Sequence, residues 1–219
     1  MNTKYIDLIN QTFDFPQEEF TVDSAKNLHF HDIDTMKLVE EYGTPLKFTY
    51  LPKISENIQK AKRMFEKSMR KHKYKGKYNY CYCTKSSHFK HVLDEALSND
   101  IHIETSSAVD INIVENLKRD GKISDKTYIL CNGFKRDEYI DKIQGLINAG
   151  HKNCIPIIDN YEEIGLLTEG VRKKINIGIR IASEEEPKFE FYTSRLGIGY
   201  KNIVEFYRRD IKENKKVSY

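Results

Sequence analysis

The sequence predicts an α/β fold organised around a parallel sheet, because segments typical of strands alternate with segments typical of helices. Five runs rich in apolar or β-prone residues begin near Tyr78, His102, Thr127, Cys154 and Asn176. The intervals between them are 24, 25, 27 and 22 residues, which leaves room for a helix between strands. This alternation implies right-handed crossovers in a sheet that is either doubly wound or part of an eight-stranded barrel. The local pattern leaves both arrangements open.

Helical periodicity occupies most of the space between these strands. Apolar side chains recur at helical spacing in segments 89–97, 109–117 and 140–147. The residues expected to cap the starts of these helices are Ser87, Ser107 and Asp137. Gly121 and Gly150 stand where two of the helices are expected to end.

The first part of the chain is less informative. Residues 1–43 show no chemical motif, and we expect the unit of alternating strands and helices to occupy residues 44–219. Within that unit, Ser55 is expected to cap a helix whose apolar residues recur at helical spacing, namely Ile58, Ala61, Phe65 and Met69.

The composition indicates a globular, cytoplasmic protein. The chain has 219 residues, 39% of them hydrophobic, with 36 basic and 33 acidic side chains. Because these charges nearly cancel, the net charge of +3 favours neither a nucleic acid nor a membrane as partner. No apolar run approaches the roughly 20 residues that cross a bilayer, and residues 1–10 do not resemble a secretory signal. Four cysteines in apolar runs suggest buried free thiols: Cys81, Cys83, Cys131 and Cys154.

Three predicted strands carry an ionisable residue near the carboxyl end. Alternation places Lys85 on the same face as Cys81 and Cys83, opposite a row of tyrosines. Glu104 stands near the end of the second strand, and Arg180 near the end of the fifth. Because small side chains suit a crowded barrel interior, we expect this face to point inward. The three groups would then lie at the end where barrel enzymes keep their active sites.

These three groups have two interpretations. They could form a solvated ion cluster at the edge of the sheet, which requires no function. Burial inside a barrel favours a second interpretation, because an isolated charge is costly to remove from water. Lys85, Glu104 and Arg180 would then pair with one another or hold a charged ligand, whose nature the spacing does not reveal.

Four segments resemble, in order, those of one enzyme family. The run Tyr80-Cys-Tyr-Cys-Thr-Lys85-Ser-Ser is similar to the cofactor-lysine strand of alanine-racemase-like barrel decarboxylases that act on arginine, ornithine or diaminopimelate. The segments that resemble the following parts of that family are Ile103-Glu-Thr-Ser-Ser-Ala-Val-Asp110, Ile179-Arg-Ile-Ala182 and Tyr192-Thr-Ser-Arg-Leu-Gly197. The resemblance implies a partial (β/α)8 TIM barrel with about five of the eight strands. The family's C-terminal β domain is expected to be absent.

The resemblance also implies a pyridoxal-phosphate-dependent amino-acid decarboxylase. Lys85 would hold pyridoxal phosphate as a Schiff base, and Glu104 and Arg180 would line the cofactor. Glutamate at position 104 is similar to biosynthetic arginine decarboxylases, whereas ornithine enzymes often have aspartate there. The acidic run from Ser183 to Phe191 resembles a bacterial arginine decarboxylase branch. Arginine, converted to agmatine in polyamine biosynthesis, is therefore favoured as substrate over ornithine and diaminopimelate.

The same resemblance implies that this chain is the N-terminal part of a longer enzyme. The family's cofactor-stacking histidine, glycine-rich phosphate loop and pyridinium-pairing glutamate come from later strands. Its partner subunit contributes catalytic residues, so a full-length homodimer is expected. We therefore expect the 219 residues alone to bind the cofactor weakly and to lack decarboxylase activity.

Two other functions stay open from the sequence. Lys85 could form a Schiff base without pyridoxal phosphate, as in barrel aldolases. The basic segment from Lys60 to Lys77, which includes Tyr74, could instead mark a non-catalytic binding module, although a solvated outer helix is the simpler interpretation. The cysteines and histidines do not have the spacing of a metal site.

Overall fold

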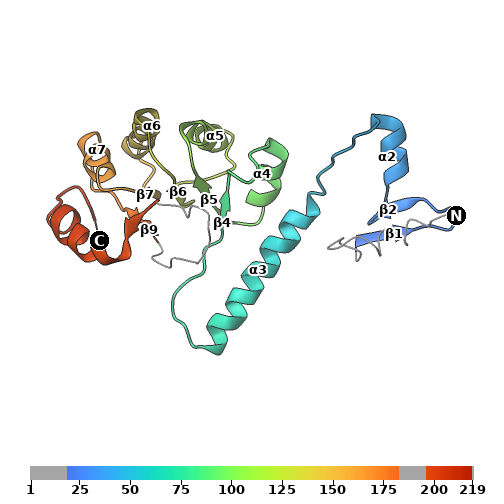
Figure 1. Ribbon diagram of the computed structural model, residues 1–219, viewed down its shortest axis with the longest axis horizontal. Helices are drawn as coiled ribbons and strands as arrows, with labels where there is room; N and C mark the ends of the chain where they lie inside the picture. Colours follow the sequence, from blue (N-terminus) through green and yellow to red (C-terminus); the bar gives the residue numbers. More distant parts are fainter. Residues whose placement is uncertain (1–18, 183–195, 219) are drawn as a thin grey trace, which may run out of the picture. The chain divides into compact units, whose positions relative to one another are not determined.

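The computed structural model describes residues 19–182 and 196–218 and divides into two compact units (Figure 1). The first unit is Met1–Tyr50 and the second is Leu51–Tyr219. This division lies a few residues beyond the change in sequence pattern at residue 43. Within the described part of the chain, no helix is long and apolar enough to cross a membrane.

The first unit contains a small antiparallel sheet followed by a helix. The strands pair in the order β1, β2 and β3, with bounds Phe20–Val22, Leu28–Phe30 and Ile33–Asp34. Helix α2, Thr35–Tyr42, begins directly after β3. The Asp34 side chain caps it by accepting hydrogen bonds from the backbone N–H groups of Met36 and Lys37.

The second unit contains the alternating strands and helices that the sequence predicts. Its sheet strands are β4 Cys81–Cys83, β5 His102–Thr105, β6 Ile129–Cys131, β7 Cys154–Ile158 and β8 Gly178–Ile179. Its main helices are α3 Pro52–Lys71, α4 Lys90–Leu97, α5 Ala108–Arg119, α6 Asp137–Asn148 and α7 Glu163–Glu169. All five strand-like runs are confirmed. Helix α7 was not predicted, because its short length gives only a weak periodic signal.

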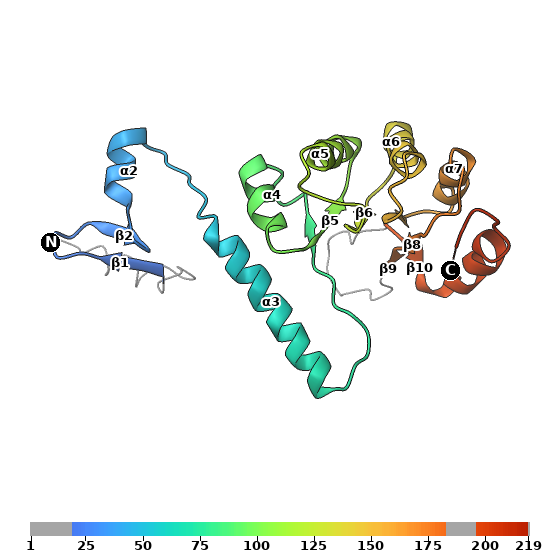
Figure 2. The same cartoon turned by 180° about the vertical axis from the view of Figure 1, so that it is seen from behind.

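The order of the strands distinguishes between the two sheet arrangements that the sequence left open. The strands are parallel and lie in chain order, β4-β5-β6-β7-β8. A doubly wound sheet reverses its strand order at a switch point and carries helices on both faces. Here α4, α5, α6 and α7 follow one another along one side of the strands (Figures 1 and 2). The architecture is therefore that of a partial (β/α)8 barrel, as the resemblance implied.

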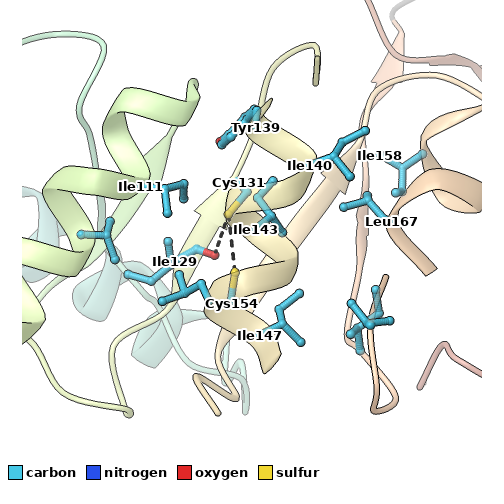
Figure 3. Close-up of a cluster of buried hydrophobic side chains, with 14 of the residues drawn as sticks. Ile111, Ile129, Cys131, Tyr139, Ile140, Ile143, Ile147, Cys154, Ile158 and Leu167 are labelled. Carbon is cyan, nitrogen blue, oxygen red and sulfur yellow. Dashed lines mark hydrogen bonds between the residues drawn. The ribbon is translucent and has the colours of Figure 1, made fainter. Parts of the chain in front are cut away.

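The main core lies between these helices and the sheet (Figure 3). Ile103, Ile129, Ile143 and Leu167 are fully buried there. Burying one such side chain contributes about 1.5–3 kcal/mol, so this layer is the principal source of stability. The core also includes chain beyond the fifth strand, because Phe206 is buried with it.

Two cysteines meet inside this core. The Sγ atoms of Cys131 on β6 and Cys154 on β7 lie 3.6 Å apart (Figure 3). The neighbouring thiol and burial raise the pKa of Cys154 above its usual range. Both residues are buried free thiols, as predicted. The same prediction was wrong for Cys81 and Cys83, whose free thiols are only partly buried.

The two faces of β4 differ as the alternation predicts. Tyr80 and Tyr82 pack against the buried clusters under the helices. Cys81 and Cys83 point to the other side, which we call the open face. Its side chains are partly exposed: Cys81, Cys83, His102, Glu104, Leu130, Ile155 and Ile157.

The helix ends test the predicted capping residues. Ser107 caps α5, as predicted, by accepting a hydrogen bond from the third N–H group of the helix at 3.3 Å. Ser87 and Asp137 were wrong as caps, because α4 begins later and Asp137 is already the first residue of α6. A carboxylate in the first turn still interacts favourably with the helix dipole. Gly121 and Gly150 follow α5 and α6 with positive φ, as expected for helix ends.

Helix α3 begins earlier than predicted. It starts at Pro52, because proline in the first turn loses no helical hydrogen bond and already has a helical φ. Ser55 therefore lies inside the helix, where its hydroxyl donates to the Glu95 carboxylate on α4. Ile58 is buried together with Ala96 of α4, which fixes α3 to the rest of the unit.

The remaining elements follow β8. They are β9 Ile181–Ala182, β10 Ile198–Gly199, η2 Tyr200–Asn202, α8 Ile203–Phe206 and η3 Tyr207–Ile211. Strands β9 and β10 pair in parallel. The acidic run from Ser183 to Phe191 and most of the segment from Tyr192 to Gly197 lie outside the described residues.

Candidate active site at the carboxyl ends of the strands

Lys85 provides an exposed amine just beyond β4. Beside it, Thr84 is fully buried, and its hydroxyl and N–H groups donate to the Glu104 carbonyl at 3.1 and 3.0 Å. These bonds hold the chain that follows β4 against β5. Within residues 19–182 and 196–218, the Lys85 side chain makes no hydrogen bond or ion pair. Its amine is therefore free to meet a ligand.

Glu104 lies on the open face near the end of β5. Its Oε1 atom accepts a hydrogen bond from Asn132 Nδ2 at 3.0 Å and contacts Cys83 Sγ at 3.8 Å. Asn132 follows β6, so the carboxylate is held between its two neighbouring strands. The contact with Cys83 confirms that the even-numbered face of β5 and the odd-numbered face of β4 point to the same side.

Arg180 lies between β8 and β9 and pairs with an acidic residue that the sequence analysis did not identify. Its Nη1 atom donates to Asp159 Oδ1 at 3.3 Å. The Asp159 side chain is 1% exposed, whereas that of Arg180 is 34% exposed. Within the described residues, Asp159 Oδ2 is buried without a hydrogen-bond partner. The arginine is thus anchored on one side and accessible on the other.

A second lysine at this end of the sheet is fully enclosed. Lys135 Nζ lies 3.0 Å from Glu163 Oε2, and the side chains are 0% and 1% exposed. The same amine donates to the carbonyls of Gly133 and Ile157. An ammonium group has three N–H donors, so these three acceptors use all of them. Lys135 is therefore a structural cation, whereas the exposed Lys85 has no partner among residues 19–182 and 196–218.

The three sequence-predicted groups come to the same end of the sheet but do not contact one another in the described structure. Glu104 is bound to Asn132, and Arg180 is bound to Asp159. The mutual pairing that we considered is therefore not found among the described residues. Sequence reasoning missed Asn132 and Asp159, although each directly follows a predicted strand.

The open face also carries a histidine that should respond to pH. His102 Nδ1 accepts a hydrogen bond from the Tyr128 backbone N–H at 3.2 Å. Burial lowers the pKa of His102 below its ordinary value of 6.5. Because the folded chain favours the neutral ring, His102 contributes stability that is fully present above pH 6.5 and is lost as pH falls through the lower folded pKa.

We therefore expect His102→Asn to flatten the pH dependence of unfolding. The asparagine Oδ1 atom replaces the accepting nitrogen but does not titrate. Urea denaturation of both proteins at neutral and mildly acidic pH measures the effect. If the variant loses as much stability on acidification as the parent, His102 is not the group responsible.

Gly197 lies where the chain passes close to Arg180. Its φ is +102°, and a Cβ atom there would lie 2.8 Å from the Arg180 carbonyl oxygen. We expect Gly197→Ala to cost about 1–2 kcal/mol or more, because the positive φ adds to the clash. Gly145→Ala is the matched control, since that glycine lies inside α6 with open space around it. The control should stabilise by about 0.5–1 kcal/mol, and urea denaturation distinguishes the two results.

Pyridoxal phosphate, which the family resemblance implies, requires a primary amine for its aldehyde and positive charge for its phosphate. Lys85 meets the first requirement, because its amine is exposed and without a partner in the described structure. The partly exposed guanidinium of Arg180 supplies positive charge at the same end of the sheet. These residues fit the cofactor, whereas the enclosed Lys135 does not.

Comparison with curated proteins finds relatives of one kind, although no family model matches the chain. The chain is 22% identical over 183 residues to the biosynthetic arginine decarboxylase of Rhodopirellula baltica, which covers 76% of this chain and 26% of that protein. It is 23% identical over 211 residues to the enzyme of the same name from Vibrio vulnificus, covering 87% and 32%. The chain therefore spans about a quarter to a third of the length of these relatives.

Solved structures show the same fold. Diaminopimelate decarboxylase from M. jannaschii superposes with a TM-score of 0.72 at 18% identity, covering 92% of this chain and 46% of that one. The biosynthetic arginine decarboxylase of Campylobacter jejuni gives 0.65 at 20% identity, covering 99% and 35%. A lysine decarboxylase from Selenomonas ruminantium gives 0.59 at 15% identity, covering 85% and 44%. The chain thus has the fold of these solved decarboxylases and is similar in sequence to curated biosynthetic arginine decarboxylases.

Proposed function

We propose that this chain forms part of the active site of a pyridoxal-phosphate-dependent enzyme that decarboxylates arginine to agmatine. The observation that carries the proposal is the exposed amine of Lys85, which has no partner in the described structure, at the carboxyl end of a barrel-type parallel sheet. Active sites of such barrels lie at this end. The second lysine at these strand ends, Lys135, is enclosed and has no free donor.

Each side chain has a distinct role in this proposal. Lys85 would hold the cofactor covalently through its Nζ atom. Arg180 and Glu104 line the site from the ends of β8 and β5, and Asp159 keeps the guanidinium in place. When bound, pyridoxal phosphate accepts the electron pair that remains after the substrate carboxylate leaves as CO2.

Arginine is the proposed substrate because the curated relatives described above are named biosynthetic arginine decarboxylases. The solved neighbours with similar folds act on diaminopimelate or lysine as well as arginine. Their fold therefore does not choose among these amino acids. We further propose that the complete protein works in the cytoplasm as a homodimer, in keeping with the resemblance to enzymes whose partner subunit completes the site.

A trapping experiment tests the choice of substrate without requiring full turnover. The chain is mixed with pyridoxal phosphate and one of four amino acids, namely arginine, ornithine, diaminopimelate or lysine. Borohydride reduction then fixes the cofactor to whichever amine holds it. We expect the arginine adduct to be retained on the protein more than the other three. Equal retention of all four adducts would contradict arginine specificity, and a sample that is reduced without added amino acid and carries no cofactor on Lys85 would contradict the site.

A further inference from the structure

We infer that the buried Lys135–Glu163 ion pair is a positioning centre that holds Glu104 and Arg180 at the open face. The inference rests on the proposed function, which gives those two side chains a cofactor to line. Neither member of the pair reaches the open face as a ligand, because their side chains are 0% and 1% exposed. The pair instead fixes the backbone groups to which it is hydrogen-bonded, and these position Glu104 and Arg180.

Lys135 joins three separate segments at the carboxyl ends of the strands. Its Nζ atom donates to the Gly133 carbonyl after β6, at 2.9 Å, and to the Ile157 carbonyl on β7. It also donates to Glu163 Oε2 at the start of α7, at 3.0 Å. Since all three donors are used, the position of this one amine depends on the positions of all three segments.

Glu163 connects Lys135 to Arg180 through Asp159. Its Oε2 atom accepts a hydrogen bond from the Asp159 backbone N–H at 2.9 Å. Its Oε1 atom accepts from the Lys135 backbone N–H at 3.1 Å. Asp159 is thereby fixed just beyond β7, and its Oδ1 atom holds the Arg180 guanidinium at 3.3 Å.

A matching set of bonds runs from Lys135 to Glu104. Lys135 Nζ donates to the carbonyl of Gly133. The N–H group of Gly133 donates to Asn132 Oδ1 at 2.9 Å. Asn132 Nδ2 in turn donates to Glu104 Oε1 at 3.0 Å. Hydrogen bonds therefore run without a break from Glu104 on β5, past β6 and β7, to Arg180 beyond β8.

Net stabilisation alone is a poor explanation for such a pair. Burying two charges costs about as much as their attraction returns, and apolar replacements of similar volume are often equally stable or more so. Apolar side chains, however, would leave the Asp159 N–H without its acceptor and Gly133 without its donor. The charged pair supplies a defined geometry that a hydrophobic pair of the same size does not.

Amide hydrogen exchange in the double variant Lys135→Met/Glu163→Met tests this role in the chain without cofactor. The double variant avoids leaving one buried charge unpaired, so it should fold. We expect the Asp159 amide to exchange roughly ten- to hundredfold faster than in the parent, because a hydrogen bond to a charged acceptor is lost. Protection at the core residue Ile103 should change much less. The matched control Glu66→Met/Arg70→Met removes an exposed ion pair on α3 and should leave Asp159 unchanged.

A second readout connects the pair to the cofactor. In the borohydride trapping assay, the double variant should need more pyridoxal phosphate for half-maximal labelling of Lys85, with an unchanged plateau. A purely structural role would leave the half-maximal concentration where it is. Unchanged exchange at Asp159, or an unchanged half-maximal concentration, would overturn the inference. If the parent chain is never labelled at Lys85, the proposed function fails, and with it the assignment of the pair to a cofactor site.

Discussion

Replacing Lys85 by alanine is expected to abolish the visible absorbance that pyridoxal phosphate acquires when the chain holds it covalently. The absorbance requires a primary amine within reach of the bound aldehyde. In the parent, the Lys85 amine is exposed and makes no hydrogen bond or ion pair among residues 19–182 and 196–218. A cofactor titration followed by visible spectroscopy measures the loss.

The control for this experiment is Lys126→Ala. Lys126 is an exposed lysine that precedes β6, so it lies at the opposite end of the strands from Lys85. Its removal should leave the titration unchanged, which separates the specific site from general labelling of surface amines. A Lys85→Ala variant that keeps the full absorbance would show that another amine holds the cofactor.

Replacing only one member of the Lys135–Glu163 pair should lower the free energy of unfolding more than the other substitutions considered. Either Lys135→Met or Glu163→Gln leaves its former partner buried and uncompensated. Removing one member of a buried pair typically costs about 3–5 kcal/mol. The double variant Lys135→Met/Glu163→Met should lose much less than the sum of the single changes, because no charge remains buried. Urea denaturation of the three variants measures the free energies of unfolding.

The exposed pair Arg70–Glu66 on α3 provides the comparison. Its nitrogen–oxygen distance is 3.3 Å, and both side chains are more than half exposed. Exposed pairs of this kind contribute only about 0.2–1 kcal/mol, so Arg70→Met should have little effect. If Glu163→Gln were as mild as Arg70→Met, the enclosed pair would not behave as a buried ion pair.

Much of the sheet could be predicted from the sequence because its signals are local. The alternation of tyrosines with smaller residues around Cys81 and Cys83 depends only on the two-residue repeat of a strand. The structure confirms that Tyr80 and Tyr82 face the helices. Ser107 was likewise predictable as a cap, because a cap and its N–H partner lie within a few residues.

Other features depend on contacts between segments that are distant in sequence. The choice between a doubly wound sheet and a barrel required the strand order, which local patterns do not contain. Asn132 meets Glu104 only because β5 and β6 pair in one register. Lys135 and Glu163 lie 28 residues apart in the sequence. Each is a charged residue in a polar connecting segment, where a solvent-exposed side chain is expected. Asp159 could have been identified as a site candidate because it is a charged residue directly after a buried strand.

Peptide mapping of the borohydride-reduced parent chain tests the central claim most directly. The chain is titrated with pyridoxal phosphate, reduced and digested, and the labelled lysines are identified by mass spectrometry. We predict saturable labelling of Lys85 at cofactor concentrations where other exposed lysines, such as Lys126, are barely modified. Labelling spread evenly over the exposed lysines, or saturable labelling elsewhere with Lys85 unmodified, would contradict the account.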